Sequence, residues 1–192
     1  MADTEKAAPA RRGRPRGFCE EAALDAAGAL FAAHGFDAVT LADLTGAMGI
    51  RPPSFYAAFG SKAALFERVL DRTISADPFA VEALAGADSL AEGLKALLGA
   101  AADRYADGCG CLVAEGLRAC TDEAARGAAE ARLAATRAMV ARFADAQGAD
   151  GERVAGLVVT ALLGLSAAAR AGEPPDALAA FARLSADGIA RA

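Results

Sequence analysis

Three features of the amino-acid sequence predict an all-α fold. Apolar residues make up 55% of the 192 residues, and many of them are alanine, which favours helices over strands. Aromatic residues are scarce, at 6%, with no tryptophan. Apolar positions recur at spacings of three and four along most of the chain, and no segment alternates as a half-buried strand does. We therefore expect helices packed closely around small side chains.

Residues 1–17 are expected to form a disordered basic arm. Prolines and glycines interrupt them, and they hold most of the positive charge of the first 62 residues, whose net charge is zero. The remainder carries the whole net charge of −5, which argues against a uniformly basic nucleic-acid binder. The arm either adds contacts in a DNA minor groove or simply solubilises the chain. Its basic residues are Lys6, Arg11, Arg12, Arg14 and Arg16.

The first helix is predicted over residues 20–34, where apolar residues form one stripe. Glu20 and Glu21 suit its positive N-terminus and His34 its last turn, while Gly35 supplies a left-handed cap.

Two short helices and a third, longer one follow, each marked by a start or stop signal. Thr40, with Asp43 three residues later, begins a helix over 41–48, and Gly49 permits a sharp turn. Two consecutive prolines fit only a first helical turn, so the next helix starts at Pro52 and ends at Gly60. Phe55 and Phe59 lie one turn apart on it and should point inward, and Ser61 should cap a helix over 62–75.

The rest of the chain is helical in pattern, with glycine-rich breaks and an ambiguous segment over 76–88. We divide the sequence into the arm, a first helical domain over 18–66 and a second over 67–192. The expected C-terminal helices are 89–106, 111–120, 122–146, 151–171 and 175–191.

A cytoplasmic location is expected, because no apolar run follows the basic start as in a signal peptide. The longest uncharged stretch, 154–169, is too short to span a bilayer and holds two glycines, which indicates a buried helix at a packed interface. The four cysteines should then be reduced.

The helices over 41–48 and 52–59, joined by a glycine turn, have the spacing of a helix-turn-helix, although many helical corners share it. The position of Lys62 strengthens the helix-turn-helix prediction. A positive charge at a helix N-terminus is unfavourable unless an anion lies nearby, and a DNA phosphate would provide one.

Tyr56, Phe59 and Lys62 form a motif within the runs 39–45, 48–50 and 54–62, which ends at Leu65 and Phe66. The end of the first helix adds Phe31, Gly35 and Phe36. Through these residues the region over 18–70 resembles the DNA-binding domain of TetR-family regulators. The resemblance implies that 18–66 is a helix-turn-helix domain and 67–192 a ligand-binding and dimerisation domain. The resemblance implies a homodimer formed by the last two helices, which binds a palindromic double-stranded operator and leaves it when a small molecule binds the C-terminal domain.

The resemblance also assigns roles by position. It implies phosphate contacts at Thr40, Tyr56 and Lys62, and base-facing positions at Arg51, Pro53, Ser54 and Ala57. An arginine can read guanine bidentately, and proline and alanine can contact thymine methyl groups. Because the recognition helix has no Lys, Arg, Asn or Gln beyond Arg51, we expect little direct readout.

The effector is expected to be a largely apolar small molecule, with no cofactor needed. Few bulky side chains are available to fill the C-terminal domain, Gly108 and Gly110 suggest a hinge, and Tyr105 and Glu115 are candidates for orienting a ligand. The core candidates are Leu90, Leu94, Leu97, Leu98, Leu112, Val113, Leu117, Met139 and Phe143. The dimer interface is expected to bury Leu157, Leu162, Leu165, Leu178, Phe181 and Leu184.

Three alternatives remain open at the level of sequence. Cys109, Cys111 and Cys120 can form a thiol or metal sensor. An architectural DNA binder without a ligand is a second alternative. An enzyme is disfavoured, because the chain has one histidine and no glycine-rich phosphate loop after a strand.

Overall fold

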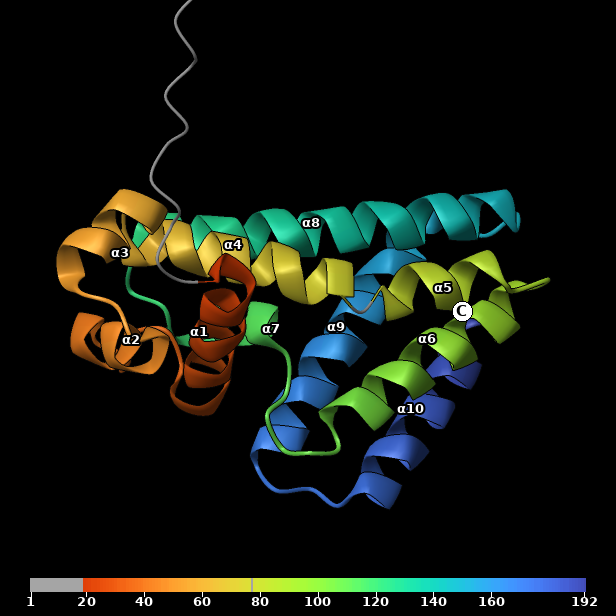
Figure 1. Ribbon diagram of the computed structural model, residues 1–192. Helices are drawn as coiled ribbons and strands as arrows, with labels where there is room; N and C mark the ends of the chain where they lie inside the picture. Colours follow the sequence, from red (N-terminus) through yellow and green to blue (C-terminus); the bar gives the residue numbers. More distant parts are fainter. Residues whose placement is uncertain (1–18, 77) are drawn as a thin grey trace, which may run out of the picture.

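The computed structural model describes residues 19–76 and 78–192, which form ten helices and no strand (Figure 1). This confirms the predicted all-α class. The basic arm predicted over 1–17 lies outside the described residues.

The N-terminal helices are α1 (Glu20–His34), α2 (Leu41–Met48), α3 (Pro52–Phe59) and α4 (Lys62–Ala76). These bounds agree with the predicted ones to within one residue. In Figure 1, α2 and α3 lie at one end of the molecule, and α4 runs from them towards the remaining helices.

Local signals set these bounds. The Thr40 side chain accepts a hydrogen bond from the Asp43 amide and the Thr40 amide donates to the Asp43 carboxylate, which completes a capping box. Gly49 adopts the left-handed conformation, as expected for the sharp turn. Gly35 has a φ of 77° but a ψ of 166°, so it reverses the chain without the left-handed helical cap that was predicted.

The C-terminal part holds six helices. The segment over 76–88, ambiguous in the sequence, contains a two-turn helix that packs against the following helix. The six are α5 (Phe79–Ala85), α6 (Leu90–Tyr105), α7 (Leu112–Ala119), α8 (Glu123–Ala146), α9 (Gly151–Arg170) and α10 (Pro175–Ile189).

Two hydrophobic cores hold the molecule together. One joins α6, α8, α9 and α10, and the other joins α1 to α4 with residues 120–129 at the α7–α8 junction. Gly116 lies so close to Phe66 of α4 and Ala129 of α8 that a Cβ there would stand 2.9 Å from the Ala129 methyl. The predicted boundary between residues 66 and 67 falls inside α4, which runs continuously from one core towards the other.

Helix α9 is long and apolar enough to cross a membrane by composition alone, and half of its most apolar stretch is buried within the protein. It packs against α6, α8 and α10, which accounts for its apolar character. Leu162, Leu165 and Leu178, predicted for a dimer interface, are buried in this subunit's own core. Leu157, Phe181 and Leu184 are exposed instead, on α9 and α10.

Candidate nucleic-acid interface and ligand cavity

Two phenylalanines on one face of helix α3 anchor it in the N-terminal core. Phe55 and Phe59 are almost fully buried in the N-terminal core, with ring centroids 5.5 Å apart. Pro52 and Pro53 fall in the first turn, where their missing N–H groups cost nothing. Burying one face in this way turns the opposite face of a two-turn helix to solvent.

The residues predicted to face DNA bases lie on this exposed surface. Arg51 precedes α3 with an extended backbone, and its carbonyl accepts hydrogen bonds from the Ser54 and Phe55 amides. The Arg51 side chain forms no ion pair with residues 19–76 or 78–192. Pro53, Ser54 and Ala57 are exposed beside it. The structure thus leaves these four residues exposed on α3 and the residue before it.

Tyr56 and Thr40 lie at the edges of this surface. The Tyr56 ring is exposed and stands edge-on to Phe55, at 5.5 Å between centroids. The Thr40 hydroxyl donates to the Asp43 carboxylate at 2.6 Å, and this contact lowers the pKa of Asp43. The same hydroxyl that would contact a phosphate therefore already caps α2.

Lys62 stands at the start of α4, as predicted, and its ammonium lies over an aromatic ring. The Nζ atom is 4.2 Å from the centroid of Phe36, within cation–π range. Partial burial lowers the Lys62 pKa, and the carboxylates of Asp37 and Asp122 oppose this shift. The lysine is thus fixed where α1, α4 and the α7–α8 turn meet, with part of its surface open to solvent.

A cavity of about 600 Å³ lies between the two cores. Its walls come from helices α1 and α4 and from α5 to α9. Leu112, Val113 and Met139 line it, as expected for a pocket, whereas Leu94, Leu97 and Leu98 fill the core behind it. A molecule bound here would touch both parts of the chain at once.

Polar residues form the smaller part of the cavity lining. The Tyr105 and Cys111 side chains share a hydrogen bond in its wall, and burial raises the Tyr105 pKa. Arg132 of α8 also lines it and forms ion pairs with Asp71 and Glu67 of α4. The volume and mostly apolar lining are those of a small-molecule site.

The three cysteines proposed as a sensor do not assemble. Cys109 and Cys111 both line the cavity, whereas Cys120 is buried in the N-terminal core at the far end of α7. Within the described chain, no three His, Cys, Asp or Glu side chains are grouped closely enough to hold a metal ion.

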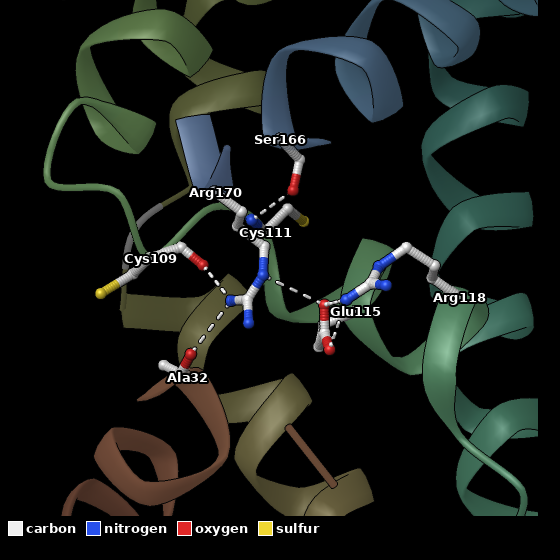
Figure 2. A network of polar contacts seen from close by, with 7 residues as sticks. All are labelled: Ala32, Cys109, Cys111, Glu115, Arg118, Ser166 and Arg170. Atoms are coloured by element: carbon white, nitrogen blue, oxygen red, sulfur yellow. Dashed lines mark hydrogen bonds and ion pairs between the residues drawn. The ribbon is translucent and has the colours of Figure 1, made fainter. Parts of the chain in front are cut away.

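Glu115, predicted as a possible ligand contact, is engaged in a buried network instead (Figure 2). Its side chain is only 7% exposed, and its carboxylate pairs with Arg118 at 2.9 Å and with Arg170 at 3.2 Å. The Arg170 Nη1 atom also donates to the carbonyls of Ala32, at 3.1 Å, and Cys109, at 2.8 Å. The sequence analysis missed Arg170, although it is the first charge after the long uncharged stretch.

The loop before α7 packs tightly on α9. Gly110 has a φ of 66°, and a Cβ there would lie 2.8 Å from the Ser166 hydroxyl oxygen and 2.9 Å from Arg170 Cγ. The Cys111 amide donates to the Ser166 hydroxyl at 2.7 Å. The glycines predicted as a hinge therefore belong to a loop seated on α9 (Figure 2).

Comparisons with known proteins agree with this geometry. Residues 23–69 match the family model described as "Bacterial regulatory proteins, tetR family". The chain is 38% identical over 181 residues to the HTH-type transcriptional repressor BdcR of Escherichia coli (strain K12), covering 92% of each chain. It is 46% identical over 80 residues to the repressor ComR of the same organism, covering 42% of this chain and 37% of ComR.

Among solved structures, it is similar to the TetR-family regulator CifR. One CifR cysteine mutant complexed with 26bp double-strand operator DNA is 34% identical, with a TM-score of 0.79, over 91% of this chain and 98% of that one. The match spans both the helix-turn-helix and the helices that enclose the cavity. The chain therefore belongs to the TetR family of bacterial regulatory proteins, which are DNA-binding transcriptional regulators rather than enzymes.

Proposed function

We propose that this chain is a cytoplasmic homodimeric repressor, which binds a palindromic operator through α3 and leaves it when a largely apolar small molecule enters the cavity. The observation that carries the proposal is the shared cavity, whose walls include α1 and α4 of the DNA-binding part. A ligand filling it contacts elements whose positions fix the two α3 helices relative to each other. Its binding energy can therefore shift the protein towards a state that fits DNA poorly.

The DNA contacts proposed for α3 follow from its exposed face. Arg51 would read a guanine, Pro53 and Ala57 thymine methyl groups, and Ser54 a base edge or phosphate. Thr40, Tyr56 and Lys62 would hold the flanking phosphates. CifR in complex with operator DNA supports this arrangement by analogy, since the matched region includes α1 to α4.

Replacing Lys62 with methionine is expected to weaken binding about equally for all DNA sequences. Methionine retains the packing on Phe36 and removes the charge, so a lost phosphate contact should lower the salt slope of log K by roughly 1 per subunit. The measurement is fluorescence anisotropy with operator and random duplexes at several salt concentrations. Lys62→Arg is the matched control and should keep the wild-type slope. An unchanged slope in Lys62→Met would remove Lys62 from the phosphate contacts.

Dimerisation through α9 and α10 is proposed from their exposed face. Leu184 is 73% exposed on α10, Phe181 is exposed one turn before it, and Leu157 is exposed on α9. Exposed glycines such as Gly164 would allow a partner helix to approach closely. Exposed apolar side chains that form a contiguous patch mark an interface, and we propose that these three do so.

The ligand-release step is tested by filling the cavity. Met139 lines it, and Met139→Trp should occupy part of the space without touching α3. We expect wild-type protein to lose operator affinity about 5- to 150-fold with an effective apolar compound, and the variant to bind operator but respond at least about tenfold less. The measurement is operator anisotropy against a panel of apolar small molecules. Release by no compound in the panel, or equal release from the filled variant, would contradict a ligand site in this cavity.

A further inference from the structure

We infer that Arg170 is the residue that couples the 107–111 loop of the cavity wall to the DNA-binding helices, acting as a clasp between that loop and the end of α1. This inference rests on the proposed function and names the contact through which it is regulated. The clasp consists of Arg170, Glu115 and the backbone carbonyls of Ala32 and Cys109 (Figure 2).

The guanidinium of Arg170 joins α9 to two segments that lie far from it in the sequence, the end of α1 and residues 109–115. It comes from the last turn of α9 and reaches the α1 carbonyl of Ala32, the loop carbonyl of Cys109 and the α7 carboxylate of Glu115. Ala32 belongs to the final turn of α1, where backbone carbonyls lack helical partners and the helix dipole is negative. A cation on this carbonyl therefore caps the helix that leads into the helix-turn-helix.

The loop that holds Cys109 belongs to the cavity wall. Cys109, Gly110 and Cys111 line the cavity, and the same loop is seated on α9 through the bond from the Cys111 amide to Ser166. Gly110 leaves no room for a side chain between itself and Arg170. A ligand that displaces this loop must therefore disturb the hydrogen bond between Arg170 and Cys109.

Glu115 fixes the guanidinium in this position. Its buried carboxylate needs a cation, and it also abuts α1, because a Cβ on Gly35 would lie 3.1 Å from its Oε1 atom. Arg118 satisfies the same carboxylate from the solvent side, but no hydrogen bond joins it to α1 or to the loop. Arg118 thus offers a matched control, which shares the charge partner without forming the bridge.

The test uses hydrogen–deuterium exchange of the full-length dimer, free and bound to an operator that the protein has selected from random duplex DNA. If the clasp couples the two parts, operator binding should protect α3 directly and also slow exchange at residues 107–111 by about tenfold in the wild type. In Arg170→Gln, protection of α3 should remain while protection of 107–111 falls to within about twofold of the free protein. Arg118→Gln should behave like the wild type.

The outcomes distinguish a failure of the proposed operator binding from a failure of the clasp. Absent protection of α3 in the wild type would contradict operator binding itself. Protection of α3 without any at 107–111, or equal protection of 107–111 in Arg170→Gln, would overturn the clasp alone. If Arg170→Gln does not fold, Arg170→Lys retains a cation for Glu115 but cannot bridge all three partners, and the same loss of remote protection is expected from it.

Discussion

Leu184→Glu is expected to convert the protein from a dimer to a monomer and to weaken operator binding by about two to four orders of magnitude. The Leu184 side chain is largely exposed in the single subunit, so glutamate there does not disturb the subunit's own core. In a two-fold interface, however, it would place two unpaired carboxylates against apolar surface. A monomer engages one half-site and loses the effective concentration that links two DNA-binding domains.

Sedimentation velocity at micromolar concentration and operator anisotropy measure the two effects of Leu184→Glu. Ala96→Glu, on the exposed face of α6, adds the same charge elsewhere and should leave both unchanged. A Leu184→Glu protein that remains dimeric with wild-type affinity would exclude α10 from the interface. Leu162→Glu, by contrast, should unfold the subunit, because Leu162 lies in the core and in the cavity wall.

Arg51→Ala is expected to relax base preference at one position in each half-site, at a cost of about 1–3 kcal/mol per half-site. Arg51 is the only basic residue at the exposed start of α3, and no other long polar side chain on that helix can replace its two hydrogen bonds. The loss of operator affinity should therefore depend on the base sequence, whereas removing a phosphate contact weakens binding to all sequences alike. Binding selection from random duplexes, compared between wild type and variant, measures it.

Arg51→Lys provides the control for charge. Lysine preserves the electrostatic attraction but not the planar fork that recognises guanine, so specificity should fall almost as far as with alanine while the salt slope stays unchanged. If both variants select the same sequence as the wild type, base reading must reside elsewhere.

The helix-turn-helix could be predicted from sequence almost to the residue, because local chemistry determines it. The Thr40–Asp43 capping box, Gly49 and the paired prolines each fix a helix boundary without help from distant residues. Phe55 and Phe59 then fix which face of α3 is buried, and this leaves the predicted DNA-facing positions in solvent. Helix α5 escaped prediction because it is two turns long, has no side-chain cap and is held by its contact with α6.

The dimer face, the cavity and the clasp depend on which faces of the helices meet. Helix α9 is apolar on most sides, so its sequence does not distinguish Leu162, in the core, from Leu157 on the surface. The cavity lies where α1 and α4 meet helices α5 to α9, and no local sequence pattern encodes this meeting of distant segments. Glu115 and Arg170 are 55 positions apart, and only the tertiary fold brings them to 3.2 Å.

Reciprocal titration of operator and effector tests the central claim most directly. The dissociation constant for the selected operator is measured with and without a saturating apolar effector, and that of the effector with and without operator. Ligand-controlled DNA binding predicts that each weakens the other by one shared factor, about 5- to 150-fold, corresponding to a coupling of 1–3 kcal/mol. An operator affinity that stays the same while the effector occupies the cavity would contradict the account.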